Sequence, residues 1–268
     1  MKEAETGVIF VHGIQGSPRQ FDFLVNKMPP QVICRSILLP GHGATLAEFK
    51  ASGMEQWLSA VLRESEEMRS RCSRLIYVGH SMGCLLGLMA EREKKLFSEM
   101  FFLCCPFYVR VTLRYLRNGI CAMNRQAQPE DEFAESFMRA NSVPPRGALA
   151  SLYCVHPYME LFKIMRRVKA EKMRPSCPAR FFFSSRDEIV SPKSALYTSA
   201  RLSVAPETLE GCGHNYFTEE AKDQLYANFF KALKPGGILF VGATEAILNF
   251  RKLGYTSFQP FFYQKPLA

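Results

Sequence analysis

The pentapeptide Gly-His-Ser-Met-Gly at residues 79–83 constrains the fold more than any other stretch of the chain. It follows an apolar run at 75–78 that predicts a buried strand, and it leads into a run at 83–95 that predicts a helix. A serine between two glycines at such a turn is typical of a nucleophile elbow, where only tiny residues fit beside the strained backbone. The pentapeptide alone is a weak signal, but the flanking strand and helix make it a strong one.

Short apolar runs alternate with helix-like segments along most of the chain. Six runs predict strands, at residues 7–13, 32–43, 74–81, 99–107, 179–190 and 207–214. Nearly continuous apolar strands separated by helices indicate a parallel sheet that is covered on both faces. The predicted fold class is therefore α/β, with a mostly parallel, doubly wound sheet.

Residues 106–174 interrupt this alternation with helices and loops. We expect a helical cap insertion there, over the carboxyl edge of the sheet, where ligands bind in open α/β folds. Between Cys105 and Pro175 there are 12 Lys and Arg against 6 Asp and Glu, most of the net charge of +9. This excess predicts an exposed helical face, or else attraction to an anionic substrate or lipid surface.

Length and composition fit one large domain, since 47% of the 268 residues are apolar. No apolar stretch is long enough to span a membrane, and the N-terminus lacks the features of a signal peptide, so we expect a cytoplasmic protein. The nine cysteines follow no metal-ligand spacing, which predicts neither a metal site nor a disulfide.

A serine nucleophile needs a base. Of the five histidines, His214 follows the last predicted strand and is the expected base for Ser81. His80 adjoins the serine, but its side chain should leave the turn in another direction. His12 and His42 lie in glycine-containing turns and are expected to shape loops.

The base in turn needs an orienting acid, and Asp187 is the expected one because it lies past a predicted strand, between Ser81 and His214. A turn or helix cap is the alternative reading of Asp187, and Glu188 is a second candidate acid. The expected donors to a developing oxyanion are the backbone N–H groups of Ile14 and Met82.

Five segments together resemble the landmarks of the α/β-hydrolase superfamily: residues 7–18, 39–44, 79–83, 184–192 and 211–217. More narrowly, the chain resembles the small bacterial carboxylesterases and monoacylglycerol lipases. This resemblance implies ester hydrolysis through an acyl-enzyme, without a metal or cofactor. It implies a triad and two oxyanion donors at Ser81, Asp187, His214, Ile14 and Met82.

The C-terminal segment resembles the end of a chemotaxis-receptor methyltransferase in its helix, Pro-Gly-Gly turn and final strands. The loop and acidic strand that hold S-adenosylmethionine in those enzymes have no counterpart in this sequence, so we expect no bound cofactor. The expected division is a hydrolase domain at 1–223 and, at 224–268, a closing helix followed by covered tail strands.

The leading prediction is a serine hydrolase that cleaves carboxylic esters. A thioesterase, an acyltransferase or an amidase would use the same triad, and the unusual tail leaves open a non-catalytic interaction protein on a hydrolase scaffold. The expected partners are a small ester and, peripherally, an anionic lipid surface, but no nucleic acid. Five apolar cap residues are expected to form either an acyl pocket or simply the core of the cap: Phe107, Leu113, Leu116, Leu152 and Phe162.

Overall fold

The computed structural model describes residues 4–28, 31–110, 112–114, 117, 132–143, 154–232, 238–240, 250–251, 254–259 and 262–266. Six strands form one sheet in the order β2–β1–β3–β4–β5–β6, and every neighbouring pair is parallel. The strands are β1 (Ala4–Val11), β2 (Ile33–Ile37), β3 (Cys72–His80), β4 (Glu99–Leu103), β5 (Ala179–Ser184) and β6 (Pro206–Leu209). The predicted α/β class with a parallel sheet is thus confirmed.

The strand order reverses between β1 and β3. The chain passes from β1 to β2 on one side and then returns to place β3 on the other side of β1. Val11, at the end of β1, pairs with Gly79 near the end of β3. The turn after β1 and the pentapeptide after β3 therefore lie side by side at the carboxyl edge, at the switch point where open α/β sheets bind ligands.

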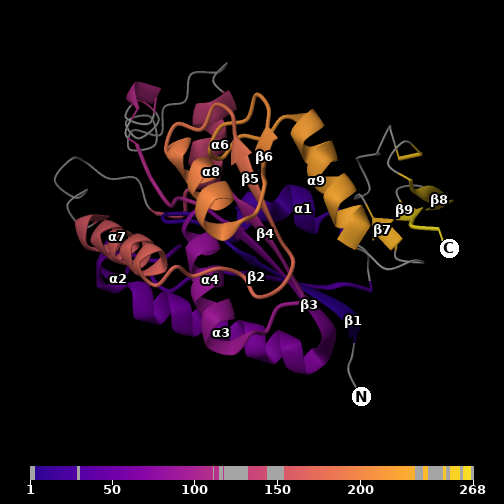
Figure 1. Ribbon diagram of the computed structural model, residues 1–268, viewed down its shortest axis with the longest axis horizontal. Helices are drawn as coiled ribbons and strands as arrows, with labels where there is room; N and C mark the ends of the chain where they lie inside the picture. The colour runs from indigo at the N-terminus through magenta and orange to yellow at the C-terminus, as the bar shows by residue number, and fades with distance from the viewer. Residues whose placement is uncertain are drawn as a thin grey trace.

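Helices cover both faces of the sheet (Figure 1). One layer holds α2 (Leu46–Ala51), α3 (Met54–Arg71), α4 (Met82–Lys94) and α7 (Val155–Ala170). The opposite layer holds α1 (Asp22–Val25) and α9 (Glu219–Ala232). The shorter elements are η1 (Pro18–Phe21), α6 (Glu132–Ala140), α8 (Lys193–Tyr197) and η3 (Thr198–Leu202).

Alternating side chains of the strands divide the core between these two layers. In β1, Ile9 and Val11 pack with the cluster that contains α3 and α4, whereas Val8 and Phe10 pack with the cluster of α1 and α9. Successive side chains of a strand point to opposite faces of the sheet. Where both faces are buried, both sets of side chains are therefore apolar. This explains why the strand-forming runs are almost continuously apolar.

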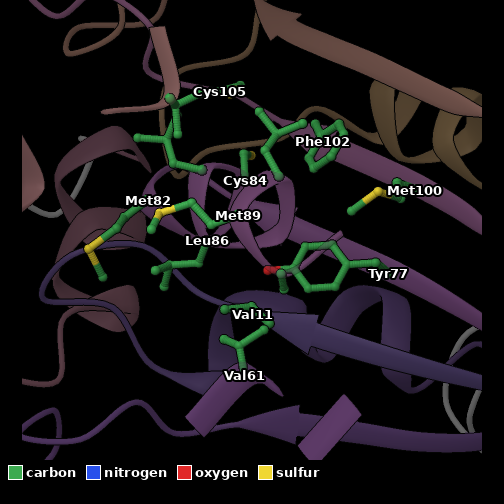
Figure 2. Packing of buried hydrophobic residues seen from close by; sticks show 14 of the residues in the cluster. Val11, Val61, Tyr77, Met82, Cys84, Leu86, Met89, Met100, Phe102 and Cys105 are labelled. Carbon is green, nitrogen blue, oxygen red and sulfur yellow. The ribbon is translucent and has the colours of Figure 1, made fainter. Parts of the chain in front are cut away.

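Helix α4 packs against β3 at Tyr77, which lies among buried residues of the core (Figure 2). The Tyr77 hydroxyl donates a hydrogen bond to the Gly83 carbonyl at 2.6 Å. A Cβ atom at Gly87 would lie 2.3 Å from the Tyr77 ring. This close packing fixes the helix that begins directly after Ser81.

Much of the predicted cap at 106–174 lies outside the described residues, and its boundaries remain a prediction. At its C-terminal end, α7 buries Leu161, Ile164 and Val168 in the main core and packs against α2, α3 and α4. Leu113 is 86% exposed. Helix α7 is thus part of the helical layer as well as a neighbour of the sheet edge.

The C-terminal segment forms a second, antiparallel sheet in the order β7–β9–β8, from β7 (Ile238–Phe240), β8 (Thr256–Gln259) and β9 (Phe262–Gln264). Before it, α9 packs Leu225 and Tyr226 on the main sheet, and the Tyr226 hydroxyl donates to the Phe23 carbonyl at 3.0 Å. The predicted division after residue 223 falls inside α9. Within the described ranges, no helix has the length and apolarity to cross a membrane.

Candidate active site

Four loops at the carboxyl edge of the sheet carry the residues predicted from the sequence. Ile14 follows β1, Ser81 follows β3, Asp187 follows β5 and His214 follows β6. Ile14, Ser81 and His214 line one cavity of about 260 Å³, while Asp187 lies buried behind His214. The structure therefore brings together residues that are up to 200 positions apart in the sequence.

Ser81 occupies a strained backbone conformation, with φ 51° and ψ −121°, directly before α4. Such a positive φ is uncommon for a residue other than glycine, and it is maintained only where the surroundings impose it. A Cβ at Gly79 would lie 2.8 Å from the Cys84 nitrogen, and one at Gly83 would lie 2.0 Å from the Val11 carbonyl oxygen. Both glycines of the pentapeptide are therefore required by close backbone contacts.

The two oxygens of the Asp187 carboxylate accept hydrogen bonds from different partners, one from the His214 side chain and the other from the backbone of its own loop. Oδ2 accepts a hydrogen bond from His214 Nδ1 at 2.9 Å, and Oδ1 accepts the N–H groups of Ile189 and Val190 at 2.8 and 2.7 Å. Burial opposes the charge, but His214 and the two N–H donors outweigh it and hold the pKa of Asp187 below its ordinary value. Asp187 thus forms a turn and also orients an imidazole.

The His214 imidazole is fully buried beside this carboxylate. Burial alone would lower the pKa of His214, but the charge and hydrogen bond of Asp187 raise it above its ordinary value of 6.5. Because Nδ1 donates to Asp187, Nε2 of the neutral ring carries the free lone pair and can accept a proton.

Glu188 holds the backbone of the same loop. Its Oε2 accepts the His214 N–H at 3.0 Å, and its own carbonyl accepts the Thr112 hydroxyl at 2.8 Å. The side chain is buried, at 3% exposure. Of the two acids considered from the sequence, Asp187 is the one that contacts the imidazole, and Glu188 fixes the position of its main chain.

His80 contacts the site in a way that the sequence did not reveal. Its side chain was expected to leave the turn in another direction, yet Nε2 donates to the His214 carbonyl at 2.7 Å and the two rings lie 4.8 Å apart. Burial, followed by the charge of His214, lowers the pKa of His80 to about 3. His80 is therefore a neutral donor that ties the Ser81 turn to the His214 loop.

His12 and His42 support the neighbouring turns. His12 Nε2 accepts the Leu39 N–H at 3.1 Å, and His42 Nε2 accepts the Gln15 N–H at 3.1 Å. Burial is the largest cause that lowers both pKa values, that of His42 to about 4. Both rings are neutral, as acceptors of backbone N–H groups must be.

The two predicted oxyanion donors lie where their N–H groups are available. In the turn after β1, the N–H groups of Gly13, Gln15 and Gly16 have acceptors in Gln20, His42 and Gly13, respectively. Within the described part of the chain, the Ile14 N–H has none. Met82 is the first residue of α4, so its N–H has no acceptor within the helix.

Arg110 is a further residue at the site that sequence reasoning missed. Its guanidinium donates to the Asp187 carbonyl at 2.7 Å, and its N–H donates to the Ile189 carbonyl at 2.8 Å. An isolated antiparallel bridge between Val109 and Val190 continues this contact. The segment after β4 therefore holds the Asp187 loop in place. No local pattern in the sequence predicts this contact between the two segments.

The walls of the cavity near Ser81 are mostly apolar: Val109, Phe137, Tyr158, Leu161, Phe162 and Ile189. Of the five residues expected in an acyl pocket, Phe162 is in this wall, whereas Phe107 is buried in the main core and Leu113 is exposed. Leu116 and Leu152 lie outside the described residues. Apart from Phe162, the apolar wall is thus built from positions that were not expected, on α6, on α7 and in the segments after β4 and β5.

Among the described residues, one group has the composition of a metal site. Nitrogen and sulfur atoms of His80, Cys104 and His214 lie within 4.8 Å of one another. Both rings already donate hydrogen bonds within the protein, and burial raises the pKa of the Cys104 thiol well above its ordinary value. The chemistry of this group suits hydrogen bonding better than metal ligation.

Comparison with known proteins identifies one family and two kinds of similar protein, a lipase and a methyltransferase. A thermostable monoacylglycerol lipase from a Bacillus strain is 24% identical over 195 residues, covering 70% of this chain and 73% of the lipase. A chemotaxis protein methyltransferase from Listeria monocytogenes is 46% identical over 50 residues. That match spans only 19% of each protein, so the chain covers less than a fifth of the methyltransferase.

Solved structures share the fold at low sequence identity. A structure from a study of the metagenome-derived lipolytic enzymes LipS and LipT has a TM-score of 0.63 at 19% identity, covering 86% of this chain and 95% of that one. A monoglyceride lipase from Saccharomyces cerevisiae has a TM-score of 0.62 at 14% identity, covering 85% and 86%. A sequence model of the alpha/beta hydrolase family matches residues 8–228. This chain, with its parallel sheet and its serine turn at the switch point, belongs to the alpha/beta hydrolase family.

Proposed function

We propose that this protein is a serine hydrolase that cleaves carboxylic esters through an acyl-enzyme. The observation that carries the proposal is the arrangement around one cavity. Ser81 stands on a strained turn, and His214, held by Asp187 at 2.9 Å, lines the same cavity. A hydroxyl, a neutral imidazole and a buried carboxylate in this order are the parts that acyl transfer requires.

In the proposed reaction, His214 Nε2 takes the Ser81 proton while Ser81 Oγ attacks the ester carbonyl. The N–H groups of Ile14 and Met82 stabilise the negative charge on the carbonyl oxygen. His214 then gives the proton to the leaving alcohol, and water releases the acid by the same steps in reverse order. Asp187 holds the imidazole in the required tautomer throughout.

The apolar wall supports an ester with an aliphatic or aromatic acyl group. Phe137, Tyr158, Leu161 and Phe162 provide a surface that water solvates poorly and that an acyl chain can cover. The volume of about 260 Å³ is small, which favours short and medium acyl chains. The monoacylglycerol lipase relative is consistent with this choice of substrate class.

We further propose that α7 contacts a lipid surface. Val155, Met159 and Phe162 recur at helical spacing with exposures of 51%, 55% and 42%, and Phe162 also lines the cavity. Lys163 and Arg166 are exposed on the same helix. Cosedimentation with anionic vesicles tests this contact, and we expect a double substitution of Val155 and Met159 by Ser to weaken it.

The decisive experiment measures hydrolysis of p-nitrophenyl esters of increasing acyl length. Wild type is compared with Ser81→Ala and with Ser199→Ala, a control at an exposed serine outside the cavity. We expect turnover by wild type and the control, and none above background by Ser81→Ala. Labelling with a fluorophosphonate, followed by peptide mass spectrometry, should place the adduct on Ser81.

Two outcomes would contradict the proposal. Turnover that survives in Ser81→Ala would place the nucleophile elsewhere. A folded wild type that neither hydrolyses esters nor reacts with the fluorophosphonate would favour the non-catalytic reading. If the enzyme preferred thioesters or amides over oxygen esters, the proposed triad would stand and only the proposed leaving group would change.

A further inference from the structure

A second cavity adjoins the one that holds Ser81, and it has a different chemistry. Its volume is about 170 Å³, and it lies between η1, the end of α6, the start of α9 and the loop at residues 215–217. The two cavities share Gln20, His80, Ala140 and Asn215 in their walls. A hydrogen bond from Gln20 Nε2 to Asn215 Oδ1, at 3.0 Å, lies in this shared wall.

The second cavity is lined by cations. Arg19, Arg139 and Lys222 contribute three positive charges. Among the described residues that line this cavity, Asp22 is the one carboxylate, and Glu132 lies beside Tyr216 of the wall. Lys222 pairs with Glu219. Among the described residues, neither Arg19 nor Arg139 has an ion-pair partner, and both side chains are exposed enough to meet a ligand at the mouth. By contrast, Arg110 is the one cation among the described residues that line the Ser81 cavity, and its guanidinium donates to the Asp187 carbonyl.

The position of this cavity matches the leaving group of an ester rather than its acyl group. In acyl transfer the base returns its proton to the leaving oxygen, so the leaving group must lie beside that base. Asn215, Tyr216 and Phe217, which directly follow His214, form one wall of the second cavity. His214, Ile14 and Ser81 line only the first cavity, so a leaving alcohol would begin beside His214 and extend past the shared wall into the second cavity.

We infer that the preferred substrates are esters of an anionic alcohol, one that carries a carboxylate or a phosphate, with the acyl group in the apolar cavity. The inference rests on the proposed esterase function and names the substrate class of that same site. Ser81 Oγ forms the new acyl bond, and the bond from the acyl carbon to the alcohol oxygen breaks. The proton that His214 took from Ser81 goes to that oxygen, while Arg19 and Arg139 attract the distal anion.

The test uses water-soluble aryl esters, which avoid any effect of a lipid interface. The substrates are para-butyryloxybenzoate, para-butyryloxyphenyl phosphate and the neutral para-butyryloxybenzamide, each compared by kcat/KM and corrected for its rate with hydroxide. The variants are Arg19→Gln, Arg139→Gln and both together. Arg63→Gln is the matched control, because Arg63 is exposed on α3 and lines neither cavity.

We expect wild type to prefer the anionic esters through a lower KM. Since exposed charge pairs are worth little individually, we expect the anionic-to-neutral ratio to fall by about threefold for each single variant and about tenfold for the double variant. High salt should reduce the preference in wild type. The carboxylate and phosphate esters show which anion the site favours.

A wild type that hydrolyses the neutral ester as well as both anionic ones would overturn the inference and leave the esterase proposal intact. The inference would also be overturned if Arg63→Gln reduced the preference for anionic esters as much as the double variant of Arg19 and Arg139 does. No hydrolysis of any ester, together with no labelling of Ser81, would instead overturn the esterase proposal. The reversal variant Arg139→Glu adds a check, because a genuine anion site should then favour the neutral ester.

Discussion

The Ser81 turn and the His214 loop are held in place by different means. The turn depends on local backbone packing, in which Gly79 and Gly83 allow a strand and a helix to meet. The loop depends on side chains from distant segments, with His80 on its carbonyl and Glu188 on its N–H. A serine held by backbone sterics tolerates almost no change of shape, whereas a histidine held by hydrogen bonds loses its position gradually.

The largest effect should follow from adding one methyl group to the turn, in Gly83→Ala. Its Cβ would lie 2.0 Å from the Val11 carbonyl oxygen, and neither backbone segment can move without disturbing the sheet. We expect a loss of about 3 kcal/mol or more in the free energy of unfolding, measured by urea denaturation, and no esterase activity. Gly43→Ala, at an exposed turn with φ 71°, isolates the cost of the backbone conformation at about 1–2 kcal/mol. Equal losses in the two variants would refute the steric argument.

The next largest effect should come from the carboxylate, in Asp187→Asn. We expect kcat to fall by about 10⁴-fold with little change in stability, because the amide keeps the shape but supports the wrong imidazole tautomer. The pH profile gives an independent readout. Asp187 raises the pKa of His214, so wild-type kcat/KM should rise with pH through a midpoint above 6.5 as the imidazole loses its proton. In the variant, burial dominates and the residual activity should have a lower midpoint. An unchanged midpoint would show that another acid sets this pKa.

A smaller loss should follow when the His214 main chain loses its acceptor, in Glu188→Ala. The buried N–H would then be unpaired, at a cost of about 1–3 kcal/mol that displaces the loop. We expect kcat/KM to fall about tenfold or more, whereas Glu188→Gln, which retains an acceptor, should recover most of it. A glutamine variant as impaired as the alanine variant would mean that the charge, rather than the hydrogen bond, is needed.

The smallest effect should come from His80→Phe, which retains a ring but removes the donor to the His214 carbonyl. A single hydrogen bond contributes about 1 kcal/mol, so we expect about a fivefold loss in kcat. His80 is neutral, so its removal takes no charge away from the surroundings of His214. The midpoint of the pH profile should therefore stay close to that of wild type. A loss as large as that in Asp187→Asn would instead give His80 a direct part in the chemistry.

The same contrast explains what could be predicted from the sequence. Ser81 was recognisable because the residues next to it in the sequence predict its turn: a glycine on each side, with a strand before and a helix after. Asp187 and His214 could be chosen because each follows a strand and their order along the chain fits the fold. The alternation of strands and helices predicts a parallel sheet. In such a sheet the ends of the strands meet at one edge, which is why Asp187 and His214 could be expected to lie close together.

The supporting contacts could not be predicted, because they join segments far apart in the chain. His80 reaches the loop of His214 across 134 positions, and Arg110 reaches Asp187 across 77. Of the residues expected in an acyl pocket, Phe162 does line the cavity, but two others lie elsewhere for the same reason. Phe107 belongs to the main core and Leu113 is exposed, since an apolar residue in a predicted cap carries no information about which surface it faces.

Helix α9 has a consequence for how such a chain can evolve. It closes the hydrolase sheet with Ala221, Leu225 and Tyr226, yet none of these residues lines either cavity. A helix from an unrelated gene that offers apolar residues at the same spacing could replace most of it, and Lys222 would be the one cavity residue lost with it. Recombination within this helix would then bring foreign strands along behind it. The antiparallel sheet of β7, β8 and β9 follows at that place, where an added segment would disturb the packing of the main sheet least.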